Sequence, residues 1–281
     1  MIPNQKQSPY YTDEHEAFRA TVRRFVEREV EPYVAEWDEA EEFPREMYKK
    51  ASELGLLQLG YPEEYGGIAC DRFYGIILSQ ELARAGCGGL SASLMSHTIG
   101  TPHLSMFGSD ELKARVLPPV LAGEKIAALA VTEPSGGSDV AALKTTARRD
   151  GDDYVVNGQK MFITSGFRAD FYTVAVRTGG PGLGGISLLL IERDRPGFDR
   201  TKLKKMGWWA SDTAALYFDD VRVPTANLIG EENQGFKAIM HNFNYERLGM
   251  AASALGYAQT CLDEASAYGR ERHTFGKPLI E

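Results

Sequence analysis

A change of hydrophobic period near Ile126 constrains the fold of this chain more than any other feature of its sequence. Before Ile126, apolar residues recur at spacings typical of helices; after it, they form short alternating or continuous runs rich in β-branched and aromatic residues. These runs are IAALAVT, DDYVVNGQKMFIT, FYTVAV, ISLLLIE and AALYFDDVRV. From about Gly235 the helical period returns and persists towards Arg272. The sequence therefore predicts an α+β fold whose elements follow the order α, β, α.

Several stretches of the first region carry helix signals. From Thr12 onwards, apolar residues occupy one stripe of a helix, and Pro32 weakens its continuation. The stripe consists of Phe18, Val22, Phe25, Val26 and Val30. Further helices are predicted from Pro44 and over residues 72–85 and 109–121, with glycine-rich breaks at 66–67 and 86–89. We expect an N-terminal helical domain over 1–125, a barrel-like or sandwich-like β-domain over 126–232, and the start of a C-terminal helical bundle over 233–281.

Two glycine motifs in the β-region indicate turns. Asn157-Gly158 lies between two alternating runs and predicts a hairpin, because both residues tolerate positive φ. GPGLGG, residues 180–185, matches G-x-G-x-x-G, but a dinucleotide fingerprint must open a helix that faces the pyrophosphate, and here a strand is predicted to follow. We interpret the second motif as a plain hairpin loop.

The composition excludes several classes of protein. With 281 residues and 43% hydrophobic content, the chain can bury a sizeable core. A net charge of −8 argues against nucleic-acid binding, which concentrates Lys and Arg on one face. The N-terminal segment lacks the apolar core of a signal peptide, and no unbroken apolar stretch is long enough to span a bilayer. We expect a soluble, cytoplasmic protein.

The cysteines indicate a reducing compartment rather than a disulfide framework. Cys70, Cys87 and Cys261 have neither metal-ligand spacing nor an even count. We interpret all of them as small buried hydrophobic residues, and we expect no metal site.

Two polar segments of the β-region are candidates for cofactor binding. LAVTEPSGGSDVAALKTTA, residues 129–147, ends a β-run and enters a turn rich in hydroxyl groups and glycine amides. Such a turn can wrap a planar heterocycle or a phosphate, because glycines allow close backbone approach, but its composition also fits an ordinary surface turn. GQKMFITSG carries Phe162, which fits either a ring packed on a strand or an ordinary core strand. Neither segment decides the function alone.

In their order along the chain, these segments and several others resemble the acyl-CoA dehydrogenase family. The matching motifs are EYGG, VTEPSGGSDV, NGQKMFIT, MGWWASDTAALYFDDVRVP, ERLGMAASALGYAQ and RERHTFGKPL. GEENQGF and the Glu246-Arg247 pair are similar to the long-chain and isovaleryl branches of the family. The resemblance covers almost the whole chain, and several motifs in a fixed order make it specific.

The resemblance implies that the protein binds FAD. The segment from Leu129 to Ser138 would cradle the flavin, with Thr132 near the polar edge of the ring and Ser138 reaching both the cofactor and CoA. Packing on the isoalloxazine face is implied for Phe162, where many members have tryptophan. The full set of implied cofactor residues is Leu129, Val131, Thr132, Gly137, Ser138, Phe162, Ile163, Thr164, Arg272, Thr274 and Phe275.

The last members of that set imply an oligomer. Arg272, Thr274 and Phe275 belong to the run that, in the family, reaches the FAD of a neighbouring subunit, so a homotetramer or homodimer is implied. His273 lies in the same run, and we interpret it as a surface or packing residue.

Glu246 is the candidate catalytic base. Removing the α-hydrogen of a thioester as a proton requires a base, and a carboxylate shielded from water suffices because desolvation raises its pKa. A glutamate on a long helix is usually only solvated. In the long-chain and isovaleryl branches, however, the base lies on the first helix after the β-domain, directly before an arginine, which is the position of Glu246. Asn244, Tyr245 and Arg247 match positions that line the CoA and acyl channel.

The implied function is FAD-dependent dehydrogenation of a long or branched saturated acyl-CoA to the trans-2-enoyl-CoA, with electrons passed to an electron-transfer flavoprotein. A flavin oxidase or monooxygenase of the same fold remains an alternative, as does a non-catalytic acyl-CoA-binding protein. The resemblance stops at Glu281, where family members continue. We therefore expect a fragment that lacks the alternative base position near the family's C-terminus and is inactive by itself.

Overall fold

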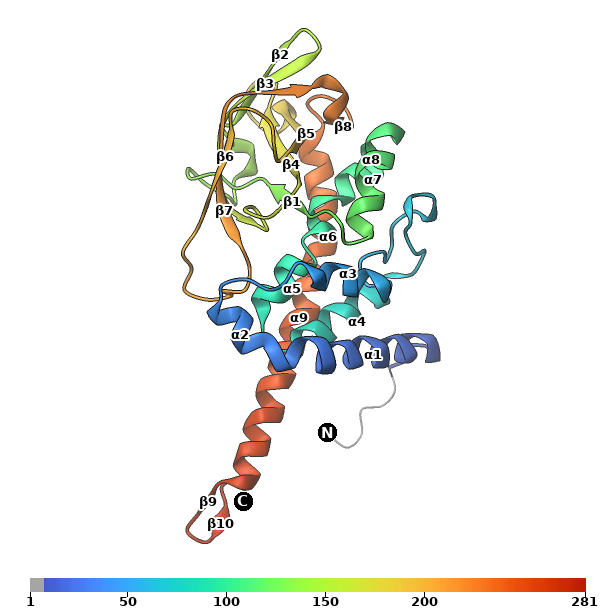
Figure 1. Cartoon of the computed structure of the whole chain (residues 1–281), viewed down its shortest axis with the longest axis vertical. Coiled ribbons are helices and arrows are strands. Elements are labelled where there is room, and N and C mark those ends of the chain that lie inside the picture. The colour runs from blue at the N-terminus through green and yellow to red at the C-terminus, as the bar shows by residue number, and fades with distance from the viewer. Residues whose placement is uncertain (1–7) are drawn as a thin grey trace.

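The computed structural model describes residues 8–281 (Figure 1). Residues 1–7, part of the segment interpreted above as lacking a signal peptide, lie outside the described residues. The first helices are α1 (Asp13–Phe25), α2 (Val34–Glu39), α3 (Glu46–Glu53), α4 (Arg72–Ala83), α5 (Gly88–Leu94), α6 (His97–Gly100), α7 (Pro102–Phe107) and α8 (Asp110–Leu121). The strands are β1 (Ala127–Ala130), β2 (Thr146–Asp150), β3 (Asp153–Thr164), β4 (Phe171–Arg177), β5 (Ile186–Glu192), β6 (Phe198–Lys202), β7 (Thr213–Pro224) and β8 (Leu228–Ile229). They are followed by α9 (Gly235–Glu271) and a hairpin of β9 (His273–Thr274) and β10 (Lys277–Pro278), so the predicted α, β, α order is confirmed.

The predicted stripe at the start of the chain becomes the core-facing side of α1. Thr12 caps the helix by accepting the N–H of His15, and Asp13 and Glu14 suit its positive end. The stripe continues through a π-helical turn, Val26–Val30, and is buried from Val22 to Val30. Pro32 lies within a short 3-10 turn, Glu31–Tyr33, after which α2 begins at Val34.

One predicted break in the helical region is confirmed only in its first half. Residues 86–89 were expected to separate helices, yet Gly88 and Gly89 are the first residues of α5. The separation is made by Gly86, whose φ of 69° belongs to the left-handed region. A Cβ on Gly88 would lie 2.2 Å from Nε1 of Trp208, so these glycines allow a close approach of the β6–β7 loop to α5.

The strands form one mixed sheet in the order β6-β7-β3-β2-β4-β5-β8, with β1 pairing parallel to β4. The loop 180–185 joins the antiparallel strands β4 and β5, as predicted. Asn157-Gly158 is not a hairpin turn: it lies inside β3, at a bulge opposite β7. Asn157 exchanges side-chain and backbone hydrogen bonds with Asp220, and a Cβ on Gly158 would lie 2.7 Å from the backbone of Thr145. The turn of the β-hairpin lies earlier in the chain, between the antiparallel strands β2 and β3.

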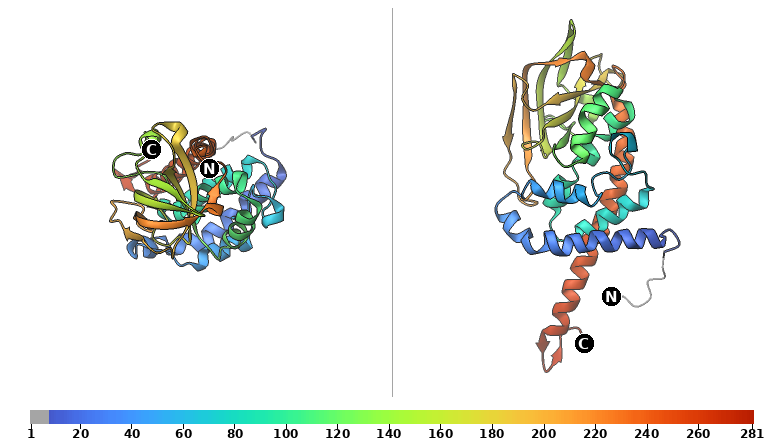
Figure 2. Two further views of the ribbon diagram at one scale, coloured as in Figure 1. Left: turned by 90° about the horizontal axis from the view of Figure 1, so that it is seen from above. Right: turned by 45° about the vertical axis from the view of Figure 1, so that its right-hand side comes forward.

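The long helix α9 connects the parts of the molecule. It passes the end of β5, then packs against α4, and finally extends beyond α1 to the β9–β10 hairpin (Figure 2). A Cβ on Gly235 would lie 2.8 Å from the backbone of Ser187, and one on Gly256 would lie 2.6 Å from the carbonyl oxygen of Gln80. From Met250 onwards, α9 exposes large apolar side chains, namely Met250, Leu255, Leu262 and Tyr268.

Other features of the described residues complete the fold. Within residues 8–281, no helix is long and apolar enough to cross a membrane. The cysteines form no disulfide there, but the expectation that all are buried is wrong for Cys261, which is exposed on α9. Cys87 is buried and Cys70 is half-buried.

Candidate active site

The turn after β1 is anchored by a buried ion pair. The Nζ of Lys160 lies 2.9 Å from Oε1 of Glu133 and donates also to the carbonyl oxygen of Val131 at 3.0 Å. The Glu133 carboxylate accepts the backbone N–H groups of Lys144 and Thr145 at 2.7 and 2.8 Å. Both charged side chains are essentially inaccessible to solvent, so they fix where the predicted cofactor turn leaves the sheet.

Phe162 lies beside this turn because β3 bulges there. The pairing of β3 with β7 shifts register between Lys160 and Ile163, and Phe162 takes a φ of 62°. Its ring is 68% exposed, whereas Ile163 remains in the core. The N–H of Met161 donates to the carbonyl oxygen of Thr132 at 2.8 Å, which joins the bulge to the turn. The structure thus brings the two predicted cofactor segments together and presents an apolar ring next to them.

The turn itself has an open, polar surface. Thr132 and Gly137 are half-buried, and Ser138 is exposed. A Cβ on Gly137 would lie 3.1 Å from the methyl group of Thr132, while one on Gly136 would meet nothing within 4 Å. Among the described residues, the backbone N–H groups of Gly137 and Ser138 donate to no protein acceptor. These features fit a segment that contacts a flat polar ligand through its backbone.

Glu246 lies on α9, in the stretch where α9 begins to pack against α4. Its side chain is half-buried, and burial raises the pKa of its carboxyl group to about 7, although the neighbouring charge of Arg247 acts in the opposite direction. Its Oε1 accepts a hydrogen bond from the side-chain amide of Asn242. A carboxyl group with this pKa is half ionised near neutral pH, as a general base requires.

A hydrophobic cluster joins the first part of α9 to the segment that follows β1. Val131, just after β1, and Ile239, on α9, belong to the same buried cluster. Leu129 and Phe243 pack against that cluster, and Phe243 precedes Glu246 by less than one helical turn. The first part of α9 is therefore fixed on the same core as the turn that carries Thr132.

The predicted substrate residues separate into two groups. Asn244 and Arg247 are exposed and joined by a 2.8 Å hydrogen bond from the guanidinium to the amide oxygen. Tyr245 turns to another side of α9, where the guanidinium of Arg72 lies 3.8 Å from the centre of its ring. Tyr245 also packs edge-on against His241. Tyr245 is thus held by α4, whereas Asn244 and Arg247 remain available to a ligand.

The remaining predicted cofactor residues are far from this site within one chain. Arg272, Thr274 and Phe275 belong to the β9–β10 hairpin at the free end of α9 (Figure 1). Phe275 is fully exposed, with a φ of 52°, and His273 is exposed as expected. Nothing in a single chain brings this hairpin to Thr132 or Glu246.

Sequence reasoning missed Lys160, Glu133 and Asn242. Lys160 and Glu133 are far apart in sequence, so no local pattern signals their pairing. Asn242 had a readable signal, because an amide and a carboxylate four residues apart lie on one face of a helix.

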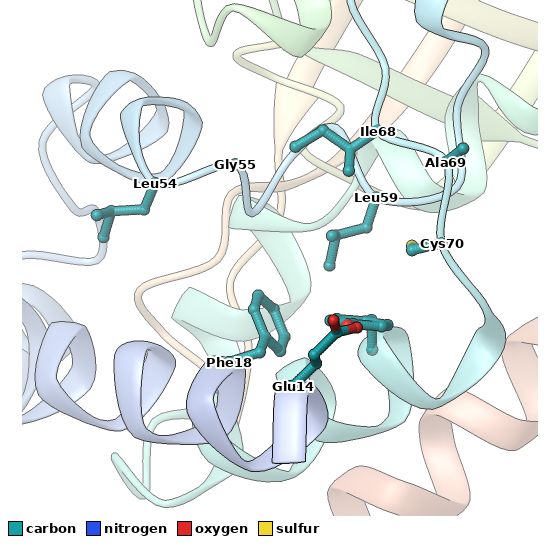
Figure 3. Close-up of a pocket in the computed structure, with 9 residues that line it drawn as sticks. Glu14, Phe18, Leu54, Gly55, Leu59, Ile68, Ala69 and Cys70 are labelled. Carbon is teal, nitrogen blue, oxygen red and sulfur yellow. The ribbon is translucent and has the colours of Figure 1, made fainter. Parts of the chain in front are cut away.

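A separate cavity of about 390 Å³ lies in the helical region (Figure 3). Phe18 and Glu14 of α1 face Leu59, Ile68 and Cys70 across it. None of the predicted site residues lines this cavity. Within residues 8–281, no group of His, Cys, Asp or Glu side chains is arranged to hold a metal ion.

Comparisons with known proteins agree with this architecture. The family models described as acyl-CoA dehydrogenase N-terminal, middle and C-terminal domains match residues 12–124, 128–221 and 233–281. The long-chain specific acyl-CoA dehydrogenase of Sus scrofa mitochondria is 40% identical over 273 residues, which cover 96% of this chain and 63% of that protein. The mitochondrial isobutyryl-CoA dehydrogenase of Bos taurus is 39% identical, covering 95% of this chain and 64% of that protein. The chain thus spans less than two thirds of the length of these relatives.

Solved structures give the same result. A crystal structure from Mycobacterium smegmatis, described as an acyl-CoA dehydrogenase, is 52% identical with a TM-score of 0.95, covering 97% of this chain and 72% of that chain. An acyl-CoA dehydrogenase of Bacillus anthracis complexed with FAD is 32% identical with a TM-score of 0.91, covering 98% of this chain and 47% of that chain. By sequence motifs, fold and these similarities, the chain belongs to the acyl-CoA dehydrogenase family.

Proposed function

We propose that this protein catalyses the FAD-dependent α,β-dehydrogenation of a saturated acyl-CoA thioester to the trans-2-enoyl-CoA. The observation that carries the proposal is Glu246, a half-buried carboxyl group with a pKa of about 7 on the helix that packs on the cofactor-segment core. In its ionised form Glu246 takes the α-proton of the substrate. The family membership supports this reaction class.

The residues present fit FAD. The free N–H groups of Gly137 and Ser138 and the hydroxyl of Thr132 would hold the polar edge of the ring, and Phe162 would cover its face. The buried Val131 and Ile163 and the half-buried Leu129 and Thr164 would support these contacts from behind. When bound, FAD supplies the acceptor for the β-hydrogen of the substrate. The FAD complex of the Bacillus anthracis relative supports this assignment.

The substrate would lie between the cofactor turn and α9. Ser138, Asn244 and Arg247 are polar and exposed, so they can bind the CoA portion. Tyr245 would contribute indirectly, since Arg72 holds its ring against α4. A long-chain or branched acyl group is favoured by the substrates named for the porcine and bovine relatives.

We further propose an electron-transfer flavoprotein as the electron acceptor and a homo-oligomer, tetramer or dimer, as the assembly. The exposed β9–β10 hairpin supports the oligomer, because Arg272, Thr274 and Phe275 can reach a cofactor only in another subunit. A domain division at residues 125 and 232 is supported by the start of β1 at Ala127 and of α9 at Gly235. We propose the cytoplasm as the location, which unbridged cysteines suit.

Anaerobic titration with acyl-CoA tests the proposal. The FAD-loaded protein should lose its flavin absorbance when a long-chain or branched acyl-CoA is added, and shorter or unbranched thioesters in the same panel rank the substrates. Admitting air then separates the reaction types: slow reoxidation supports a dehydrogenase, whereas fast reoxidation with peroxide release identifies an oxidase. A protein that binds acyl-CoA but carries no flavin would be a non-catalytic binding protein.

A further inference from the structure

Asn242 is a buried amide in the middle of α9. It is 4% exposed and lies on the face that also buries Ala238 and Ile239. An apolar residue would serve packing better there, because asparagine is a poor helix former and a buried amide costs free energy unless it is hydrogen-bonded. The role of Asn242 must therefore come from the hydrogen bond that its side-chain amide makes.

That partner is Glu246. The Nδ2–H group of Asn242 donates to Oε1 of Glu246, one helical turn later. Within residues 8–281, neither oxygen of this carboxylate accepts a hydrogen bond from any other protein group. The amide thus fixes one oxygen and leaves Oε2 free to accept a proton.

The charged surroundings do not replace this bond. On α9, the charge that acts on Glu246 is that of Arg247, whose guanidinium is hydrogen-bonded to Asn244. The packed elements face other residues: Arg72 of α4 lies over Tyr245, and His241 of α9 faces His103 of α7, whose pKa it helps to lower. Opposite the next turn of α9, at Gly249, α4 offers the uncharged hydroxyl of Ser79.

We propose that Asn242 is a positioning residue, which orients the Glu246 carboxylate for proton abstraction and stabilises its ionised form. The inference rests on the proposed function, because it takes Glu246 as the base. It goes further in assigning the two carboxylate oxygens different tasks: Oε1 receives the amide N–H, and Oε2 receives the α-proton.

The test is the pH dependence of flavin reduction by acyl-CoA in the FAD-loaded protein. Asn242→Leu removes the donor while keeping the branched shape of the side chain. We expect the pH of half-maximal rate to rise by about one unit, since a hydrogen bond to a charged group is lost. We also expect the limiting rate at high pH to fall roughly tenfold, because the carboxylate is no longer oriented. Asn242→Gln, whose amide still reaches one turn along the helix, should restore much of both.

Gln259→Leu is the matched control. Gln259 donates to Asp263 at 2.8 Å with the same four-residue spacing on the same helix, but this hydrogen bond is exposed and lies beyond the predicted site. This variant should leave the pH profile unchanged. Flavin absorbance and thermal melting verify that all variants are folded and loaded.

Glu246→Gln distinguishes the role of Glu246 as the base from the role of Asn242 as its positioning residue. If Glu246→Gln reduces flavin at the normal rate, Glu246 is not the base, and the role of Asn242 fails with it. If Glu246→Gln loses the rate but Asn242→Leu keeps both the normal pH profile and the normal limiting rate, Asn242 does not position the base. That second result overturns the inference on Asn242 alone and leaves the proposed function intact.

Discussion

Two sheltered carboxylates, Glu133 and Glu246, have opposite properties. Burial would raise the pKa of Glu133, but the charge of Lys160 and the N–H donors around the carboxylate hold it below its usual range. Burial also acts on Glu246, where the charge of Arg247 does not offset it, and the pKa rises to about 7. The carboxylate with more fixed donors is therefore the one less able to take a proton.

The difference fits a structural role for Glu133 and the proposed role of Glu246 as a base. Glu133 is held by Lys160 of β3 and by the N–H groups of Lys144 and Thr145 just before β2, so it anchors the predicted cofactor turn. Glu246 lies on a helix surface with a single amide donor and one free oxygen. A structural carboxylate needs all of its acceptor sites filled, whereas a general base needs one site empty.

Glu246→Gln should have the largest effect. The amide cannot take a proton, so the rate of flavin reduction by acyl-CoA should fall about a thousandfold, within the range ascribed to a general base. Stopped-flow absorbance under anaerobic conditions measures this rate. Gln259→Leu on the same helix should stay within twofold of the wild type. A Glu246→Gln rate within tenfold of the wild type would mean that Glu246 is not the base. Glu246 and Glu133 would then not differ in chemical role.

Lys160→Met should destabilise the fold by about 3–5 kcal/mol, because it leaves the Glu133 charge buried without its partner. Urea unfolding at pH 7 gives the free energy of unfolding. Arg222→Met is the control, since Arg222 pairs with Asp150 and Asp153 on the surface, and its loss should cost less than about 1 kcal/mol.

A double variant checks the cause of that loss. Lys160→Met combined with Glu133→Leu removes both charges and should recover most of the lost stability, although the N–H groups of Lys144 and Thr145 then lose their acceptor. If Lys160→Met alone unfolds like the wild type, the ion pair does not hold the turn.

The sequence predicted the fold correctly where the spacing of apolar residues along the chain decides the local structure. Residues 235–272 kept one helical period, and α9 is indeed one helix of 37 residues. The prediction failed where distant segments decide the local conformation. Gly158 follows the strand because Thr145 lies against it, and Gly88 starts a helix because Trp208 covers it. Such contacts leave no trace in a window of neighbouring residues.

The candidate site divides in the same way. The resemblance to a family singled out Thr132, Phe162 and Glu246, and the structure puts the segments of the first two side by side. The Lys160–Glu133 pair could not be predicted, because nothing local links a lysine on a strand to a glutamate in a turn. The 68% exposure of Phe162 also depends on a bulge that its alternating run does not show.

Gly256→Ala tests whether close packing of α9 keeps Glu246 sheltered. A Cβ at 256 would lie 2.6 Å from the carbonyl oxygen of Gln80, so α9 must move away from α4, at a cost of about 2 kcal/mol. The added exposure should lower the pKa of Glu246 from about 7 towards its ordinary value. Urea unfolding and the pH profile of flavin reduction measure the two effects.

Gly249→Ala is the matched control for this packing. Its Cβ would lie 3.7 Å from the hydroxyl of Ser79, which is ordinary contact. Because alanine is the better helix former, this variant should be neutral or up to about 1 kcal/mol more stable. Equal effects of the two substitutions would show that the spacing between α4 and α9 does not depend on Gly256.

The smallest expected effect is the pH dependence of stability, in which the two carboxylates should differ in sign. The folded pKa of Glu246, about 7, lies above its unfolded value, so the folded state binds the extra proton, and stability falls as pH rises from about 4.5 to 7. The folded pKa of Glu133 is lowered, so its contribution is present above its unfolded pKa and is lost as pH falls through the folded one.

Urea unfolding at pH 4, 6 and 8 compares the wild type with Glu246→Gln and Glu133→Gln. Glu246→Gln should equal the wild type at pH 4 and exceed it by about 1 kcal/mol at pH 8, a figure reduced from the full shift because solvent partly screens a half-buried group. Glu133→Gln should be less stable than the wild type at pH 8, with a difference that shrinks as the medium becomes acidic. Parallel curves for all three proteins would show that neither carboxylate changes its pKa on folding. The difference between Glu133, with several hydrogen-bond donors, and Glu246, with one donor and a free oxygen, would then have no effect on stability.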